Sequence, residues 1–170
     1  MTLYDIIDTP IGELTLTATD EGLTGVHFAG DGQPAGARPL GGRDGSPAAA
    51  VLAAARAQLA AYFAGELVTF DLPLVAHGTP FQERVWVTLR GIGHGETISY
   101  TELARRVGSP RAVRAVGGAN GRNPIPIVVP CHRVIAAGGK LGGFGGGLDR
   151  KQWLLEHEGV MLGAGARGRG

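Results

Sequence analysis

The chain has 170 residues, which fits one domain or two small ones and is long enough to bury an apolar core without disulfides or metal ions. Its single cysteine excludes an intrachain disulfide and any zinc site built from several cysteines, and it points to a reducing compartment. The sequence shows no secretory signal and no apolar run that could span a bilayer, so we expect a soluble, cytoplasmic protein without a membrane partner.

Charge is distributed unevenly along the chain, although its net value is only +1. Residues 1 to 78 carry three basic against nine acidic residues, net −6, whereas residues 79 to 170 carry thirteen basic against six acidic residues, net +7. This asymmetry indicates that a polyanion, if one binds, contacts the second half. A merely dipolar surface would show the same distribution, so charge alone does not decide between the two.

Residues 1 to 78 are predicted to form an α+β domain. Clusters of β-forming residues indicate strands over residues 2 to 7, 13 to 18 and 23 to 28. Residues 30 to 45 are rich in Gly, Pro, Ala and Arg and contain few large apolar side chains, which predicts a flexible loop.

A helix is expected to follow this loop and to cover the sheet. Ser46 can cap its N-terminus, Pro47 suits its first turn, and apolar residues then recur at helical spacing until Gly65. Residues 67 to 72 are a candidate for one further strand. The turn-forming residues 77 to 80 indicate the domain boundary.

The second domain is predicted over residues 79 to 161 and begins with a helix. Thr79 and Gln82 form a capping-box pattern, apolar residues follow at helical spacing, and Gly91 ends the helix. Residues 162 to 170 consist mainly of Gly, Ala and Arg, which predicts a disordered tail.

Two further short helices with a glycine turn between them indicate a helix-turn-helix. Ser99 and Glu102 open the first helix with another capping-box pattern, and Gly108 closes it. The pair Ser109-Pro110 then predicts the start of the second helix, which runs to about Ala119.

The second of these helices has a cationic and thin exposed face. Arg111 and Arg114 lie one turn apart, beside small residues that include Ala115 and Gly118. Residues 99 to 133 contain six arginines and one acidic residue, an excess that would neutralise phosphates. The pattern predicts contact with nucleic acid, although a solvated arginine face on a helix pair that binds no DNA has the same composition.

The single cysteine follows a short β-branched run. Residues 127 to 129 are predicted to be extended, and Pro130 interrupts the pairing, so Cys131 should lie at the end of an element. A free thiol is only a few per cent thiolate at neutral pH, and His132 and Arg133 follow as candidate activators. A cysteine among apolar residues can equally be an inert core residue, and only a turn would bring Cys131 and His132 together.

Residues 138 to 147 contain seven glycines. Their spacing matches no phosphate-binding loop, and a backbone without side chains favours a segment that forms one wall of a binding site for a flat ligand. Asp149 is expected to cap the last helix, and Glu158 lies at the end of that helix just before Gly159. Because a carboxylate is disfavoured at a helix C-terminus, Glu158 should have a cationic or hydrogen-bonding partner, such as a histidine.

Together these features resemble the methylated-DNA-protein-cysteine methyltransferases, the family that repairs O6-alkylguanine. The matching segments are Arg114–Gly118, Asn123-Pro124, Pro130–Val134, Gly145–Leu148 and Trp153–Gly159. The N-terminal part is similar, more weakly, to the ribonuclease-H-like half of that family. The resemblance implies an α+β fold with a small ribonuclease-H-like domain and a helical, winged-helix-like domain that contains the helix-turn-helix.

The resemblance also implies roles for the residues of the active site. Cys131 would attack the alkyl carbon and keep the alkyl group permanently. His132 would act on the thiol through a water molecule, and Glu158 would orient the histidine. Asn123 would be the hinge between the recognition helix and the active-site segment.

By the same resemblance, the protein would contact double-stranded DNA through the minor groove. Arg114 would enter the duplex and fill the space of the extruded nucleotide, and Tyr100 would help to rotate that nucleotide out. Arg111, Ala115 and Gly118 would complete the DNA-contacting surface.

The flipped base would enter a pocket lined by Pro126, Val134, Phe144, Gly145 and Gly146. Phe144 stands where the family more often has tyrosine, so a hydroxyl contact to the base is absent. Some family members bind zinc through N-terminal cysteines and histidines. This chain lacks those cysteines, and we expect no metal and no other cofactor.

The implied function is DNA repair by a single-turnover methyltransferase, with irreversible alkyl transfer from O6-alkylguanine to Cys131. O4-alkylthymine is a further candidate substrate, and we expect a monomer in solution. The sequence leaves open the preference for methyl or bulkier groups and cooperativity on DNA. A DNA-binding module without transfer and a cysteine hydrolase are the alternatives; the cysteine argues against the first, and no oxyanion hole is identified for the second.

Overall fold

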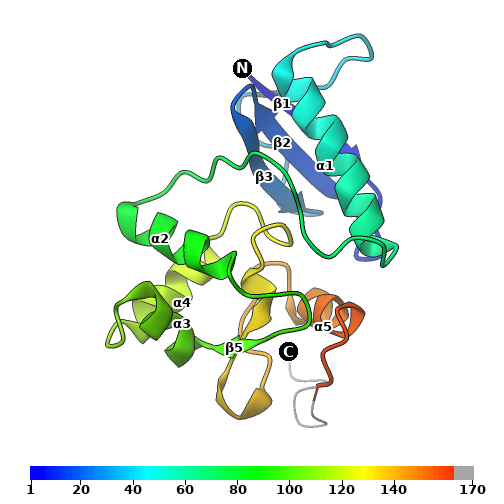
Figure 1. Cartoon of the computed structure of the whole chain (residues 1–170). Coiled ribbons are helices and arrows are strands. Elements are labelled where there is room, and N and C mark those ends of the chain that lie inside the picture. Colours follow the sequence, from blue (N-terminus) through cyan, green and yellow to red (C-terminus); the bar gives the residue numbers. More distant parts are fainter. Residues whose placement is uncertain (163–170) are drawn as a thin grey trace. The chain divides into compact units, whose positions relative to one another are not determined.

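A computed structural model describes residues 1 to 162, which form two compact units with their boundary between His77 and Gly78 (Figure 1). The first unit combines a sheet with one helix and the second is mainly helical, so the predicted α+β class is confirmed. The tail predicted over residues 162 to 170 lies, after its first residue, outside the described residues. In the described part no helix is both long and apolar enough to cross a membrane.

The first unit is built on a four-stranded sheet with the order β3, β2, β1, β4. β1 (Thr2–Ile7), β2 (Leu14–Thr19) and β3 (Gly22–Phe28) are antiparallel neighbours and confirm the three predicted strands. β4 (Ala37–Pro39) pairs in parallel with β1. It lies within residues 30 to 45, so the prediction of a flexible loop was wrong there. Backbone pairing with β1 forms this strand despite a composition poor in β-forming residues.

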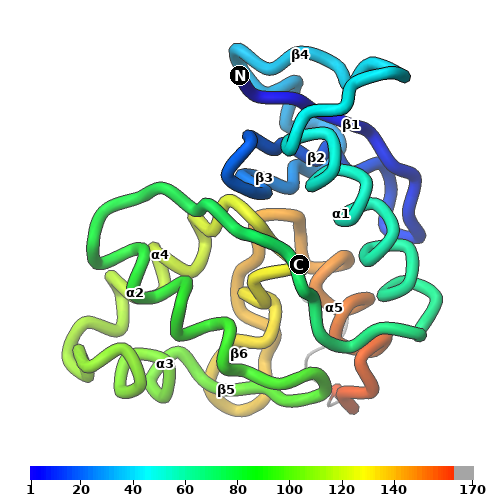
Figure 2. The backbone as a smooth tube through the Cα atoms, turned by 45° about the horizontal axis from the view of Figure 1, so that its top comes forward, coloured from blue at the N-terminus to red at the C-terminus, as the bar shows by residue number. Residues whose placement is uncertain are grey.

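One helix, α1 (Pro47–Phe63), lies across one face of this sheet (Figures 1 and 2). Ser46 caps it as predicted, because its side chain accepts a hydrogen bond from the Ala49 N–H. The buried apolar side chains of the two layers include Leu3, Leu14, Leu16, Ala18, Leu23, Val26 and Phe28 from the strands and Leu52, Ala55, Leu59 and Tyr62 from the helix. Apart from the hydroxyl of Tyr62, these buried side chains are apolar, as expected for a helix that covers a sheet.

The further strand predicted over residues 67 to 72 does not form. The chain pairs with β3 a few residues later, where Leu74 forms an isolated bridge with Leu23. The Leu23 N–H donates to the Pro73 carbonyl and the Val75 N–H donates to the Leu23 carbonyl, each at 2.8 Å. The prediction was wrong because the backbone bonds to a side chain in this segment: the N–H and the carbonyl of Asp71 both bond to the Gln58 amide, each at 2.8 Å.

The second unit begins with α2 (Pro80–Leu89). Thr79 accepts a hydrogen bond from the Gln82 N–H at 3.1 Å, and the Gln82 side chain accepts one from the Thr79 N–H at 3.0 Å. The predicted capping box is therefore confirmed. On the buried face of this helix, Trp86 donates from Nε1 to the carbonyl of Ala119 at 2.8 Å, which ties α2 to a later helix.

α3 (Tyr100–Val107) and α4 (Val113–Gly121) form the predicted pair of short helices. α3 ends at Gly108, whose φ of 87° is the left-handed conformation that glycine adopts without strain. α4 begins later than predicted, because Ser109 starts a turn and not the helix. Arg111 therefore lies in the connecting turn. Serine and proline favour turns as well as helix starts, so the sequence did not distinguish the two.

Short elements complete the second unit. β5 (Ile98–Ser99) pairs in parallel with β6 (Val134–Ile135), which is followed by the 3₁₀ turn η2 (Ala137–Gly139) and by α5 (Leu148–His157). Asp149 lies in the first turn of α5, where its charge suits the helix dipole, but it is not the cap that was predicted. The chain enters α5 through the glycine-rich segment, so the cap position falls on a glycine.

Candidate active site

Cys131 begins a single 3₁₀ turn, η1 (Cys131–Arg133), that leads directly into β6. The residues before it are not extended as predicted, because they form a turn closed by a bridge between Pro126 and Val129. Ile127 adopts a φ of 74° in this turn, which is strained for a β-branched residue. The apolar pattern gave no sign of the turn, yet Cys131 does lie at the end of an irregular stretch, with 6% of its surface exposed.

The residues after Cys131 form a buried ionic network with the C-terminal end of α5. His132 Nε2 lies 2.8 Å from Glu158 Oε2, and both side chains are fully buried. Arg133 donates two hydrogen bonds to the Glu158 carboxylate, from Nε to Oε1 at 2.8 Å and from Nη2 to Oε2 at 3.0 Å. It donates a third from Nη1 to the Ile92 carbonyl at 2.6 Å. The partner predicted for Glu158 is therefore present, and Arg133 adds a second one that offsets part of the cost of burying the carboxylate.

Burial sets the protonation states around the sulfur. It raises the pKa of the Cys131 thiol, while a hydrogen bond with Asn123, the charge of Lys151 and nearby backbone N–H groups reduce that shift. Burial also lowers the pKa of His132, although Glu158 acts in the opposite direction. At neutral pH a protonated thiol thus lies beside a neutral imidazole. The Nδ1 atom of that imidazole has no hydrogen-bond partner among the described residues.

Two asparagines at the C-terminal end of α4 hold the segment that leads to the sulfur. Asn123, the predicted hinge, donates to the Val129 carbonyl at 2.7 Å and accepts from the Ile125 N–H at 3.0 Å. Asn120 is buried within α4 and donates to the Cys131 carbonyl at 3.4 Å. Side-chain hydrogen bonds therefore connect this helix to the residue that carries the thiol.

A buried cation lies near the thiol. Lys151 is fully buried and donates to the carbonyls of Val134 at 2.7 Å and Gly143 at 3.0 Å. Burial lowers the pKa of Lys151 to about 8, while the charge of Cys131 acts in the opposite direction. The Tyr100 hydroxyl donates to the same Gly143 carbonyl at 3.5 Å. Burial and the nearby Cys131 raise the pKa of Tyr100, so its hydroxyl stays protonated within electrostatic reach of the sulfur.

The predicted DNA-contacting residues lie on the surface. Arg114, Ala115 and Gly118 are exposed together along one face of α4, and Arg111 is exposed in the turn before it. A Cβ atom added to Gly118 would meet no atom within 4 Å, so the surface is open at this point. The structure thus places a thin, cationic face on the helix whose buried side holds Asn120.

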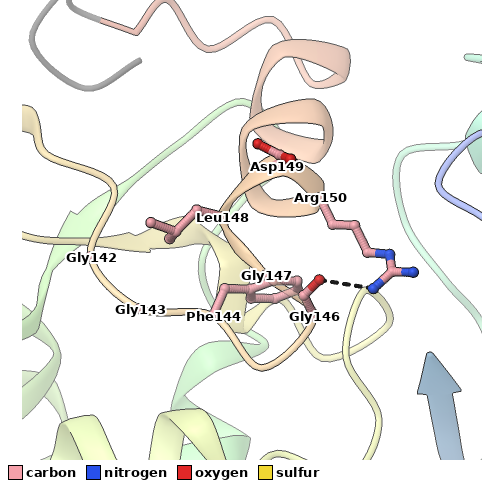
Figure 3. Close-up of a pocket in the computed structure, with 8 residues that line it drawn as sticks. All are labelled: Gly142, Gly143, Phe144, Gly146, Gly147, Leu148, Asp149 and Arg150. Carbon is pink, nitrogen blue, oxygen red and sulfur yellow. Dashed lines mark hydrogen bonds between the residues drawn. The ribbon is translucent and has the colours of Figure 1, made fainter. Parts of the chain in front are cut away.

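A pocket of about 770 Å³ lies beside the glycine-rich segment and the first turn of α5 (Figure 3). Its lining consists of Gly142, Gly143, Phe144, Gly146, Gly147, Leu148, Asp149 and Arg150. Arg150 donates from Nη1 to the Gly146 carbonyl at 3.0 Å, which fixes one wall of the pocket (Figure 3).

Only part of the predicted base pocket lines this cavity. Phe144 and Gly146 belong to its lining, whereas the side chains of Pro126 and Val134 are buried and Gly145 is exposed on the loop. Cys131 is not in the lining either. Gly143 links the pocket to the surroundings of the thiol, because it lines the cavity and its carbonyl accepts the hydrogen bond from Lys151.

Two family models together match nearly the whole chain. Residues 2 to 76 match the ribonuclease-like domain of 6-O-methylguanine DNA methyltransferase, and residues 80 to 160 match its DNA binding domain. The chain belongs to this methyltransferase family. The family and the two-part α+β fold inferred from the sequence are thereby confirmed.

Individual methyltransferases match this family member over almost their full length. The methylated-DNA--protein-cysteine methyltransferase of Mycolicibacterium paratuberculosis is 54% identical over 91% of each chain. The one from Methanosarcina acetivorans is 47% identical over 92% of this chain and 97% of its own. The crystal structure of Mycobacterium tuberculosis OGT in complex with DNA is 49% identical over 92% of each chain, with a TM-score of 0.83. The similarity therefore extends well beyond the motif around the cysteine.

Sequence reasoning missed three buried polar residues of this methyltransferase. Arg133 follows His132 and was considered only as an activator of the thiol, whereas the structure shows it on Glu158. Lys151 and Asn120 gave no signal, because a lysine or an asparagine in a short helix is usually exposed. Only the tertiary structure reveals that both side chains are buried and bonded to carbonyl groups near the thiol.

Proposed function

We propose that this protein repairs alkylated double-stranded DNA by moving the alkyl group from O6 of guanine to Sγ of Cys131, once per molecule. The observation that carries this proposal is the buried pair of His132, which directly follows the single cysteine of the chain, and Glu158 at the end of α5. Burying an imidazole and a carboxylate costs folding free energy, and such groups concentrate where chemistry needs them. An inert core cysteine would need neither.

The thiol must lose its proton in order to attack. Because Cys131 is protonated and His132 is neutral at rest, a proton can pass from Sγ through a water molecule to Nδ1. The carboxylate of Glu158 then stabilises the imidazolium through Nε2. Arg133 holds that carboxylate in place with two hydrogen bonds, so the imidazole keeps one orientation.

The transfer exchanges one bond to carbon for another. The Sγ–C bond forms as the C–O6 bond breaks, the electron pair of the broken bond stays with guanine, and the proton that left the thiol is returned to the guanine ring. The product is a thioether, which has no proton to lose and is a poor leaving group at neutral pH. Cys131 therefore cannot be regenerated, and the protein acts stoichiometrically.

The alkyl carbon becomes accessible only when the base leaves the stack, which costs a few kcal/mol. The exposed face of α4 is thin at Ala115 and Gly118 and can approach the minor groove closely. Arg114 on this face would fill the space of the extruded nucleotide, Tyr100 would help to rotate it, and Arg111 would bind a phosphate.

The extruded base would enter beside the glycine-rich segment, where Phe144, Gly145 and Gly146 would contact it together with Pro126 and Val134. Asn123 would act as the hinge that couples α4 to this site. The substrate is double-stranded DNA with O6-alkylguanine, and O4-alkylthymine is a second base for the same chemistry. We propose a monomer in solution, with cooperativity on DNA to be read from the shape of the binding isotherm.

Titration with a duplex that carries radiolabelled O6-methylguanine tests this proposal. We expect label to move to the protein up to one equivalent and then to stop. Binding of the duplex without transfer would indicate a DNA-binding module instead. Release of label with repeated turnover would indicate a hydrolase, and either result would contradict stoichiometric repair.

A further inference from the structure

Two buried polar atoms next to Cys131 have no hydrogen-bond partner among the described residues: Oδ1 of Asn120 and Nδ1 of His132. Asn120 is 4% exposed and His132 is fully buried. The Asn120 amide also donates from Nδ2 to the Cys131 carbonyl at 3.4 Å, so its orientation is set by the residue that carries the thiol. Buried polar groups nearly always have partners. One of these two exceptions belongs to the residue after Cys131 and the other to a side chain bonded to the Cys131 carbonyl, which favours one shared partner.

Both unpaired atoms are hydrogen-bond acceptors. An amide oxygen can only accept, and Nδ1 of a neutral imidazole accepts when Nε2 carries the proton, as it does where Nε2 faces the Glu158 carboxylate. Two acceptors cannot bond to each other. A molecule that satisfies both must donate two hydrogen atoms, and one that also receives a proton from the Cys131 thiol must accept as well. Water meets all three conditions.

We propose that Asn120 is a positioning residue of the transfer reaction, because its Oδ1 atom and His132 Nδ1 are the two acceptors that orient the proton-carrying water at Cys131. This inference rests on the proposed alkyl transfer. The thiol donates its proton to the water oxygen as the water passes one of its own protons to Nδ1. The second water hydrogen stays on Oδ1, which keeps the water lone pair directed at the thiol.

The position of Asn120 on α4 also connects the proposed DNA-contacting surface to the site of proton transfer. Asn120 lies on the buried side of α4, the helix whose exposed face carries Arg114 and Gly118. Trp86 holds the carbonyl of the neighbouring Ala119 at 2.8 Å, so this turn of α4 is anchored independently of the thiol. The helix proposed to read DNA therefore also positions the proton acceptor beside the nucleophile.

The variant Asn120→Leu tests the proposal, because leucine has a similar size and no acceptor. We expect its reaction with free O6-benzylguanine and with alkylated duplex to be slower by about tenfold at pH 7, the size expected for an outer-shell orienting group. The difference from the wild type should shrink as the pH rises towards 10, because the thiolate fraction grows and a thiolate needs no water to take its proton. Lys151, Tyr100 and His132 also titrate around the sulfur and are unchanged in the variant, so comparison with the wild type removes their contribution.

Trp86→Phe is the matched control. It removes the other hydrogen bond that anchors this turn of α4, at the carbonyl of Ala119, and should lower the thermal stability without changing the shape of the pH profile. If Asn120→Leu behaved like Trp86→Phe, with a loss of stability and an unaltered pH profile, Asn120 would be structural only and the proposal would be overturned.

A double variant separates this inference from the proposed function. In a His132→Asn background the water can no longer pass a proton to Nδ1, so its orientation by Asn120 no longer matters. Adding Asn120→Leu should therefore slow the reaction by less than about a further twofold. A full tenfold effect in both backgrounds would contradict the shared water. Absence of any transfer by the wild-type protein would instead reject the proposed function, irrespective of Asn120.

Discussion

The two units of the chain bury different kinds of side chain. Among the described residues up to His77, the buried polar side chains are limited to Thr17, and the ion pairs lie at the surface, Arg38 with Asp44 and Arg56 with Asp5. Exposed pairs of this kind contribute about 0 to 1 kcal/mol to stability.

The second unit buries an amide, an imidazole and three charged groups within one site. They are Asn120, His132, Arg133, Lys151 and Glu158. Each is bonded to another of the group or to a backbone carbonyl close to the thiol. Because burying charge costs several kcal/mol per ion before compensation, the second unit gives up stability to hold these groups around the thiol, a cost that the described part of the first unit does not bear.

The largest effect should come from the thiol itself. Cys131→Ala removes the nucleophile from a site that is already formed by its neighbours, so we expect all transfer from alkylated duplex to disappear while the affinity for that duplex stays within about threefold. Transfer of radiolabel and fluorescence anisotropy with labelled DNA measure the two quantities separately. Residual transfer at a wild-type rate would show that another group is the acceptor.

Glu158→Gln should lower both activity and stability, unlike any change of an ion pair in the first unit. Arg133 loses its charged partner and His132 its orienting carboxylate, so we expect the free energy of unfolding to fall by about 3 to 5 kcal/mol and the transfer rate by about 10- to 100-fold. Denaturant unfolding and single-turnover kinetics measure these effects. The control is Asp5→Asn, which breaks the exposed pair with Arg56 and should cost less than about 1 kcal/mol with no change in rate.

Arg114→Ala should affect the reaction with DNA and spare the chemistry. The exposed guanidinium is proposed to occupy the space of the flipped nucleotide, so its loss should slow transfer from alkylated duplex by about tenfold or more. The rate with free O6-benzylguanine, which needs no flipping, should stay within about twofold. Arg43→Ala removes an exposed arginine from the first unit and controls for net charge. Equal losses with both substrates in the Arg114 variant would reject its role.

The smallest effect is predicted for pH. Because the pKa of His132 is lowered, its imidazole stays neutral as the pH falls to 6.5, and the proton acceptor is not lost. The pKa of Cys131 is raised, so the thiol is mostly protonated from pH 6.5 to 8.5 and its thiolate fraction grows about tenfold per pH unit. The transfer rate would grow by the same factor if the reaction needed thiolate that had formed beforehand. We expect instead a change of less than about threefold in the rate with free O6-benzylguanine. A slope near one would show that the imidazole takes no part.

Local signals in the sequence predicted most of the fold. The caps at Ser46 and Thr79 and the left-handed glycine at Gly108 depend on neighbouring residues alone, so the helices they delimit were predicted correctly. The short strand β4 and the later start of α4 were missed. β4 depends on pairing with a distant strand, and turn residues near α4 suit two structures equally.

The sequence predicted the candidate catalytic residues of the site but not the buried polar residues that surround them. The carboxylate of Glu158 at a helix end predicted a cationic or hydrogen-bonding partner such as a histidine, because a helix end makes a local electrostatic demand. The family resemblance identified that partner as His132, and the structure shows the pair. The left-handed Ile127 and the buried positions of Lys151 and Asn120 depend on contacts between elements far apart in the sequence. Neither apolar periodicity nor charge counting carries that information.

Peptide mapping by mass spectrometry tests the central claim most directly. After incubation with excess duplex that contains O6-methylguanine, the peptide with Cys131 should carry one methyl group in every molecule, and no other peptide should be methylated. Methylation at another residue, or an unmodified Cys131 after the lesion has been removed from the DNA, would contradict the account.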